Sequence, residues 1–410
     1  MLSALSSVQQ FLKLESAGGI VLCAAAAIAL VLANSPLEAY YAKLLDLPVT
    51  VQVGGLAIAK PLLLWVNDGL MAIFFMLVGL EVKRAVVAGE LSSLSNAALP
   101  VIAALGGMTG PALVYVACNW GDAEALRGWA IPTATDIAFA LGVLALLGSR
   151  APPALKIFLL ALAIIDDLGA IIIIAVFYTA ELSLIALILA GIGVAALVLL
   201  NLLGVSHRAT YMLVGVAIWV CVLKSGIHAT LAGVIVGIAM PLDAADGSSP
   251  AHDLEEALHP WVAFGVLPGF AFANAGLGLT DIGLSDLLQP IQLGIGLGLF
   301  VGKQLGVLVS IWVALRVGLA ALPGGTNWRH IYGVALLTGT GFTMSLFMGT
   351  LAFPAEAYDT DVRVAVLLAS VTSAICGYLV LRRASSQRSP IVAHSMDPRP
   401  NANVSSRRPI

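Results

Sequence analysis

The stretch Ala161-Leu-Ala-Ile-Ile-Asp-Asp-Leu-Gly-Ala-Ile-Ile-Ile-Ile174 places two adjacent aspartates, Asp166 and Asp167, inside an unbroken apolar run. A run of this kind predicts a helix buried in a lipid bilayer, where a charged side chain is costly. Carboxylates at that depth usually serve ion or proton handling, so both aspartates are candidate transport residues. A purely structural role for the pair is the alternative.

The composition of the whole chain predicts an all-α polytopic membrane protein. Of its 410 residues, 60% are hydrophobic and only 10% are charged, and the mean hydropathy is +1.00. Soluble domains carry roughly 25% charged residues. The net charge of −3 gives no reason to expect a nucleic-acid partner. Cys23, Cys118, Cys221 and Cys376 show neither disulfide nor metal-site spacing, and neither a cofactor nor an enzymatic activity is expected.

Apolar segments separated by Pro, Gly, Asn and charged residues predict about twelve transmembrane helices. The expected ranges are 12–33, 62–86, 97–118, 126–148, 153–178, 182–202, 208–223, 226–240, 258–275, 290–315, 329–350 and 361–382. The first range is interpreted as an uncleaved span, with a signal peptide as the alternative. Between the first two helices, residues 49–59 combine β-branched residues with a Gly-Gly turn, which predicts a small β-hairpin outside the hydrocarbon.

The placement of Lys and Arg predicts the orientation of the chain in the membrane. With both termini in the cytoplasm, the inner helix ends hold more Lys and Arg than the outer ends. An acidic inner loop at 243–256 is an exception, but acidic residues count little in this rule. Residues 384–410 are rich in Ser, Pro and Arg, which predicts a disordered cytoplasmic tail.

Two predicted helices, the fourth and the eleventh, carry matched interruptions. The fourth contains Pro132-Thr-Ala-Thr-Asp136, and the eleventh contains Thr338-Gly-Thr-Gly-Phe-Thr343. Both segments share a Thr-x-Thr core. Each lies on the middle helix of a three-helix set, helices 3–5 and helices 10–12. The helix count gives these two sets opposite topology, so they are predicted to be inverted repeats. Paired interruptions in two such halves point to a transporter binding site. An ordinary proline kink and a glycine packing face are the alternative.

Asp136 and Lys303 complete the predicted constellation with Asp166 and Asp167. Carboxylate, threonine hydroxyl and carbonyl oxygens are hard donors that suit alkali cations. Clustered acids titrate as a coupled set, so the site would hold either protons or a cation, and this competition is sufficient for exchange. Asp136 could also offset the positive ends of half-helices. Lys303 is the expected counter-charge, with snorkelling to an interface as the alternative.

Six segments, taken in order, resemble the NhaA-type sodium/proton antiporters. They are Asn67–Arg84, Pro132–Ala140, Ile164–Ala170, Lys224–Gly233, His259–Phe264 and Phe270–Gly276. The resemblance extends from about residue 10 to about residue 383. It implies an electrogenic exchange of Na⁺ or Li⁺ for H⁺ in a bacterial inner membrane. Asp166 and Asp167 would then carry the transported Na⁺ and H⁺, with Thr135 and Asp136 beside them and Lys303 as their charged partner.

The resemblance also implies a division of the transporter domain, residues 1–383, into two parts. Core helices at about 97–178 and 290–382 would move against interface helices at about 12–86 and 182–275. The hairpin at 49–59 would join two protomers into a homodimer.

The same resemblance implies a pH-response region. Glu81, Arg84, Glu255 and His259 match its cytoplasmic part, and His228 matches a further residue tied to the pH response. Considered alone, Lys83 and Arg84 could be topogenic anchors, and His228 could be structural. The chain departs from the best-studied members of the family at two positions. Ala85 stands in place of a second acid, and Glu256 stands in place of a histidine.

Two rival functions are considered. A sodium-coupled organic-anion symporter of similar architecture would need a roomier, more polar crevice between its domains. An intramembrane aspartyl protease also uses two membrane aspartates, but on facing helices and in a Gly-x-Gly-Asp context that residues 163–166 lack.

Overall fold

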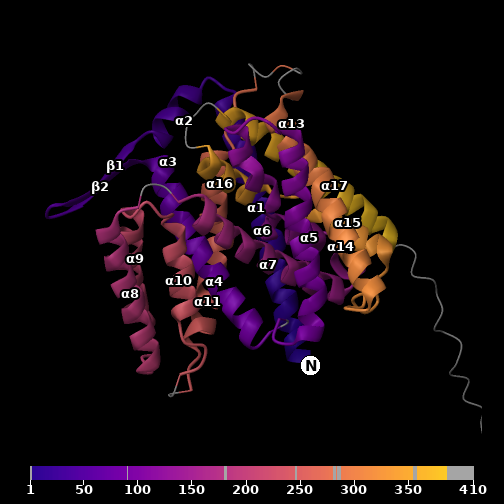
Figure 1. Ribbon diagram of the computed structural model, residues 1–410, viewed down its shortest axis with the longest axis horizontal. Helices are drawn as coiled ribbons and strands as arrows, with labels where there is room; N and C mark the ends of the chain where they lie inside the picture. Colours follow the sequence, from indigo (N-terminus) through magenta and orange to yellow (C-terminus); the bar gives the residue numbers. More distant parts are fainter. Residues whose placement is uncertain are drawn as a thin grey trace, which may run out of the picture.

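The computed structural model describes residues 2–89, 91–179, 182–244, 247–279, 283, 288–353 and 358–385. They form a bundle of helices with one small β-hairpin (Figure 1). The predicted tail lies outside the described residues beyond Ser385. The α-helices are α1 Leu2–Ala33, α2 Glu38–Leu45, α3 Leu62–Trp65, α4 Met71–Val87, α5 Leu94–Cys118, α6 Ile137–Ala145, α7 Pro153–Phe177, α8 Leu184–Leu202, α9 Arg208–Leu223, α10 Thr230–Ala239, α11 Pro250–Trp261, α12 Leu267–Asn274, α13 Pro290–Leu297, α14 Lys303–Val317, α15 Trp328–Leu337, α16 Phe342–Ala352 and α17 Asp359–Ser385.

Short helical turns of other types lie between these helices. Among the elements that the structure describes in full, η1 Val66–Leu70, η4 Val262–Val266 and η6 Gly298–Gly302 are π-helical, and η2 Ala125–Thr133 and η3 Gly148–Arg150 are 3₁₀. Each π-helical turn continues directly into the α-helix that follows it, so α13, η6 and α14 form one span.

The prediction of a helical polytopic membrane protein is confirmed. Seven helices among the described residues are long and apolar enough to cross a membrane, or up to nine if two bent helix pairs are each counted as one span. The apolar helices α9 and α10 are shorter, with 16 and 10 residues. The count of twelve spans and the inverted repeats therefore remain predictions.

Three predicted helix boundaries are wrong. The helix expected at 12–33 begins ten residues earlier, at Leu2. The helix expected at 226–240 begins only at Thr230, and Gly226 just before it has a φ of 85°, which a continuous helix does not allow. The segment expected at 258–275 already begins at Pro250, inside the stretch predicted to be an acidic loop. Proline is favoured in the first turn of a helix because its missing N–H would be unpaired there anyway.

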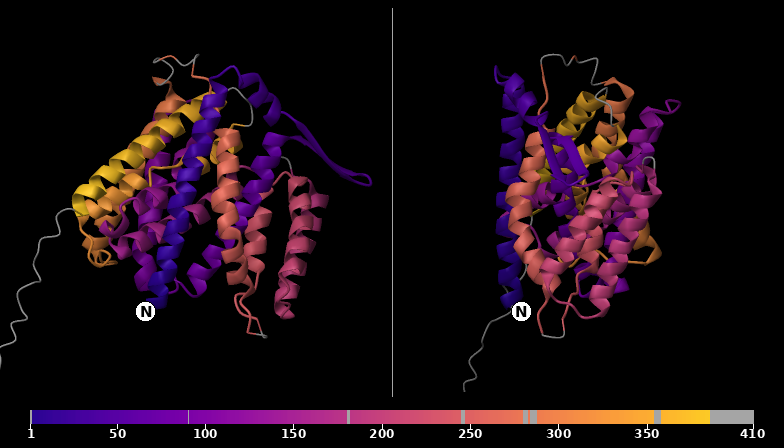
Figure 2. Two further views of the ribbon diagram at one scale, coloured as in Figure 1. Left: turned by 180° about the vertical axis from the view of Figure 1, so that it is seen from behind. Right: turned by 90° about the vertical axis from the view of Figure 1, so that its left-hand side faces the viewer.

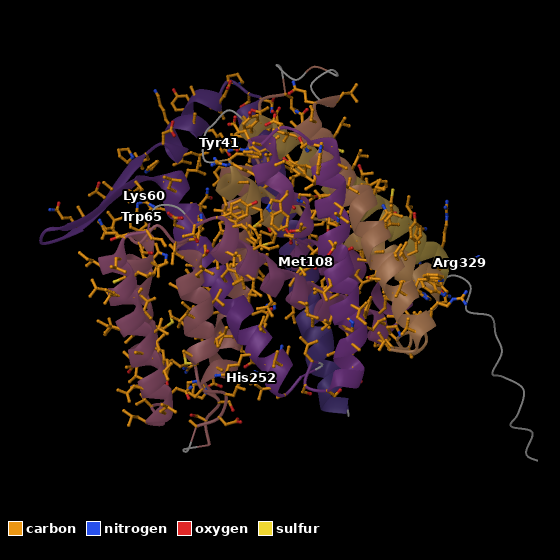
Figure 3. All side chains as sticks on the ribbon, in the orientation of Figure 1. Tyr41, Lys60, Trp65, Met108, His252 and Arg329 are labelled. Carbon is orange, nitrogen blue, oxygen red and sulfur yellow. The ribbon has the colours of Figure 1, made fainter. Side chains whose placement is uncertain are left out.

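The predicted hairpin is confirmed. Strands β1 Pro48–Val53 and β2 Leu56–Pro61 pair antiparallel, with Gly54 in the left-handed region at the turn. The hairpin projects away from the helices at the end of the molecule opposite the N-terminus (Figure 2). At its base, Trp65 Nε1 donates to the Val49 carbonyl at 3.1 Å, and Lys60 forms an ion pair with Asp68 at 2.7 Å. Figure 3 shows Lys60 and Trp65 together there, with His252 of α11 at the opposite end.

Glycines bring α5 into close contact with the span formed by α13, η6 and α14. Gly106 and Gly110 of α5 face Gly302 and Gly306, and a Cβ added at Gly306 would collide with the carbonyl oxygen of Gly106. Small residues at a four-residue spacing allow two membrane helices to approach closely. Lys303 directly follows Gly302 in this contact, and a Cβ added at Gly107 of α5 would lie 3.9 Å from its Nζ.

A Gly306→Ala variant should therefore be less stable than the parent, because its methyl group has no space. Overpacking of this kind costs about 1–3 kcal/mol. The matched control is Gly296→Ala on the same span, where an added Cβ would meet nothing within 4 Å. Thermal unfolding in detergent should show a lower midpoint for Gly306→Ala alone. Equal midpoints for the two variants would contradict this account of the packing.

Candidate ion-binding site

The two predicted interruptions are present, and they contact each other. In the first, η2 ends at Thr133 and α6 begins at Ile137, with Ala134 and Asp136 extended between them. In the second, the axes of α15 and α16 differ by 44°. The Asp136 N–H donates to the Thr340 carbonyl at 2.7 Å, so the two interruptions are hydrogen-bonded to each other. Irregular backbone is tolerated at membrane depth only when it is satisfied within the protein.

Asp136 caps both half-helices that leave this crossing. Its Oδ1 accepts from the Phe139 N–H in the first turn of α6 at 2.9 Å. Its Oδ2 accepts from the N–H and the hydroxyl of Thr343 in α16, at 3.0 and 2.5 Å. A carboxylate at the positive ends of two helices is electrostatically favourable. Thr343 was not predicted as a partner, although it lies in the quoted Thr338–Thr343 motif.

Asp166, Thr135 and Lys303 form one fully buried hydrogen-bonded group. Lys303 Nζ lies 2.5 Å from Asp166 Oδ2 and 2.9 Å from the Thr135 hydroxyl oxygen. The Thr135 hydroxyl is 2.7 Å from Asp166 Oδ2 and 2.9 Å from the Thr338 carbonyl. A hydroxyl has one proton, so Thr135 can donate to only one of these two acceptors at a time. The snorkelling alternative for Lys303 is wrong, because its Nζ is bound inside the protein.

The position of Lys303 follows from the helix that carries it. The π-helical turn Gly298–Gly302 ends directly before it, and such turns often mark functional sites. The close contact of Gly302 with the backbone of Pro111 excludes lipid from this part of the span. The side chain of Lys303 is 0% exposed.

Asp167 is buried differently from its neighbour. Consecutive residues of a helix point about 100° apart, so the two carboxylates face different surroundings. Among the described residues, neither oxygen of Asp167 has a hydrogen-bond partner, and Asp166 Oδ1 has none either. Asp166, Asp136 and Glu81 are close enough to Asp167 to act on it electrostatically. A fully buried carboxylate without partners requires an explanation, and a bound proton or cation supplies one.

The residues predicted for the pH response divide into two groups. Arg84 forms a bidentate ion pair with Glu255, in which Nε lies 2.9 Å from Oε2 and Nη2 lies 2.9 Å from Oε1. Glu81 and His259 interact electrostatically with members of this pair. Glu255 lies on α11, one turn after His252, which Figure 3 shows at the end of the molecule away from the hairpin. His228 is not part of the group.

His228 lies instead near the hairpin base, where Asp68 and Lys60 act on it electrostatically and its ring meets the edge of Phe347 at 6.3 Å. The two departures from the family pattern also differ in environment. Ala85 is buried in α4, whereas Glu256 is exposed beside the paired Glu255. Sequence reasoning did not identify the Lys60–Asp68 ion pair, although Asp68 lies in the quoted Asn67–Arg84 segment.

Crossed, interrupted helices around buried carboxylates and a buried lysine define the class of ion-coupled membrane transporters. All four cysteines are free. The family model described as Na⁺/H⁺ antiporter 1 matches residues 9–381, so the chain belongs to this family.

Individual relatives are similar over nearly their whole length. The Na⁺/H⁺ antiporter NhaA of Rhodospirillum rubrum is 57% identical over 94% of this chain and 99% of its own. NhaA 1 of Syntrophotalea carbinolica is 55% identical over 93% and 97%, and NhaA of Yersinia enterocolitica is 54% identical over 92% and 97%.

Proposed function

We propose that this membrane protein exports Na⁺ (or Li⁺) in exchange for H⁺ by binding either ion at Asp166 and Asp167. Na⁺/H⁺ exchange is the activity that the names of its relatives state. The single observation that supports this site is Asp167, a carboxylate with 0% exposure and no hydrogen-bond partner among the described residues. Its oxygens, with the free Oδ1 of Asp166, are hard donors suited to an alkali cation.

The hydrogen bonds suggest how one site can exchange the two ions. An incoming cation would compete with Lys303 for Asp166, and the Thr135 hydroxyl could then direct its proton to the Thr338 carbonyl, leaving an oxygen lone pair for the cation. Protons would displace the cation by neutralising the same carboxylates. If both aspartates release protons for one Na⁺, the exchange carries net charge and is electrogenic.

Several further features belong to this proposal. The chain would have twelve spans with inverted repeats, and its core helices would move against the interface helices to give alternating access. It would lie in the bacterial inner membrane with both termini in the cytoplasm and would dimerise through the hairpin. The projection of the hairpin away from the bundle is compatible with that role (Figure 1).

Regulation by pH would depend on the group around Arg84 and Glu255. Their ion pair joins α4 to α11, and α4 also packs against α7, the helix of Asp166 and Asp167. Protonation that weakens the pair could therefore be transmitted to the site through α4.

The test of the function is sodium-induced proton release in everted membrane vesicles that contain the protein. Adding NaCl should collapse a preformed pH gradient, whereas choline chloride at the same ionic strength should not. Vesicles without the protein are the control. A sodium-dependent uptake of organic anions without a change in pH would instead support the symporter alternative.

If protons and Na⁺ share one site, the apparent KM for Na⁺ should rise as the pH falls. Each competing proton changes the apparent KM by up to about tenfold per pH unit, equivalent to about 1.4 kcal/mol. Initial rates measured over a range of Na⁺ concentrations at several acidic pH values give this slope. An apparent KM that stays constant across the acidic limb would indicate separate sites.

A further inference from the structure

A pocket of about 470 Å³ opens where α7 and α16 end and η2 begins. Its walls include Leu126, Arg127 and Trp129 from η2, Phe177 and Tyr178 from the end of α7, and Leu351 from α16. Further along, α7 carries Asp166 and Asp167, and α16 carries Thr343, the partner of Asp136. Thr135 and Asp136 follow the end of η2. No residue of the candidate ion site lines the pocket. Its volume lies within the range of roughly 300–1,000 Å³ that is usual for small-molecule sites.

The walls of the pocket are held by specific contacts. The Trp129 and Phe177 rings meet edge to face, with centroids 5.2 Å apart and planes at 81°. The Tyr178 hydroxyl donates to the Arg127 carbonyl at 2.7 Å and joins the end of α7 to η2. Phe177 nevertheless remains 61% exposed. The pocket is therefore a formed surface with an exposed apolar wall.

Arg127 supplies a positive charge that has no acidic partner in the described part of the chain. Its side chain is exposed and makes no hydrogen bond or ion pair with any described residue. Asp122, the acid that precedes η2, instead accepts from the backbone N–H groups of Glu124 and Ala125 at 3.0 Å each. A planar guanidinium with free donors is well suited to bind a phosphate group.

The length of α7 places the pocket at the level of lipid headgroups. Its 25 residues extend about 38 Å at a rise of about 1.5 Å per residue, whereas the hydrocarbon core is about 30 Å thick. If the first turn of α7 lies at one membrane–water interface, its last turn therefore reaches the opposite interface. Trp and Tyr are enriched at this level, in agreement with Trp129 and Tyr178.

We propose that this pocket binds one membrane phospholipid, with its phosphodiester on the guanidinium of Arg127 and its apolar part against Phe177 and Trp129. Asp122 and Glu124 lie close to Arg127 in the chain and are both exposed. They favour a headgroup that carries its own cation, so the lipid is of the phosphatidylethanolamine class rather than the phosphatidylglycerol class. The bound lipid joins the ends of η2, α7 and α16 and stabilises them against separation.

The experiment is a lipid titration of delipidated, purified protein followed by native mass spectrometry. Phosphatidylethanolamine and phosphatidylglycerol with identical acyl chains are compared in the parent, Arg127→Gln, Arg127→Lys and Phe177→Ala. Arg127→Gln should raise the apparent Kd for phosphatidylethanolamine about tenfold or more, the loss expected for a charge-assisted bond. Arg127→Lys should have an intermediate effect, and Phe177→Ala should weaken binding with the charge intact.

The matched control is Lys43→Gln, which removes an exposed cation of α2 that does not line the pocket. Thermal unfolding with and without lipid is the second measurement. The stabilisation by phosphatidylethanolamine should be lost in Arg127→Gln and kept in Lys43→Gln. Equal Kd values for the parent and Arg127→Gln would overturn the proposal. Equal affinity for the two lipids would overturn the headgroup assignment, and a stabilisation reproduced by inorganic phosphate would overturn the assignment to a lipid.

Discussion

An Asp167→Asn variant is expected to fold normally and to lose sodium-driven proton flux down to the background of vesicles without the protein. The amide has nearly the shape of the carboxylate but carries no charge and releases no proton. No hydrogen bond to a described residue is lost, because neither oxygen of Asp167 has one. Removing a buried charge also relieves its desolvation cost, so the variant should be at least as thermally stable as the parent.

The measurement combines expression level, thermal unfolding midpoint and initial proton flux in everted vesicles. Asp46→Asn, which neutralises an exposed acid at the end of α2, is the matched control and should retain full flux. Near-parental flux from a well-expressed Asp167→Asn protein would remove Asp167 from the exchange mechanism. A variant that is inactive because it is unfolded would contradict the expected stability instead.

A Lys303→Met variant is expected to be strongly destabilised. Methionine fills a similar space but leaves Asp166 buried without its counter-charge, since both side chains are 0% exposed. Removing one partner of a buried ion pair costs about 3–5 kcal/mol, because the remaining charge is uncompensated. The thermal unfolding midpoint in detergent should therefore fall well below that of the parent.

A second substitution tests this explanation directly. The double variant Lys303→Met, Asp166→Asn also removes the charge of Asp166. It should regain most of the stability lost in Lys303→Met, because no uncompensated charge remains. Lys43→Met on the exposed surface of α2 is the control for loss of a lysine and should have little effect. If the double variant is as unstable as Lys303→Met alone, packing rather than charge explains the instability.

The local features of this protein could be predicted from its sequence because they depend on neighbouring residues. Val49–Ala59 carries its own turn glycines, and Pro132 and the glycines after Thr338 interrupt helices wherever those helices lie. The charges at Asp166 and Lys303 are conspicuous against their apolar surroundings for the same reason. The boundaries near Gly226 and Pro250 were predicted incorrectly, because hydrophobicity marks the apolar part of a segment and not the limits of its helix.

Only the tertiary structure decided which of these groups meet. The crossing of the two interrupted helices makes Asp136 a cap for both of them, a role that depends on Thr343 more than 200 residues away. Lys303 pairs with Asp166 and not with Asp167, although the two aspartates are adjacent in the chain. Adjacent side chains on a helix point in different directions, so their environments are determined by the helices packed around them. The sequence alone thus identified the two carboxylates, and the packing around α7 left Asp167 without a partner among the described residues.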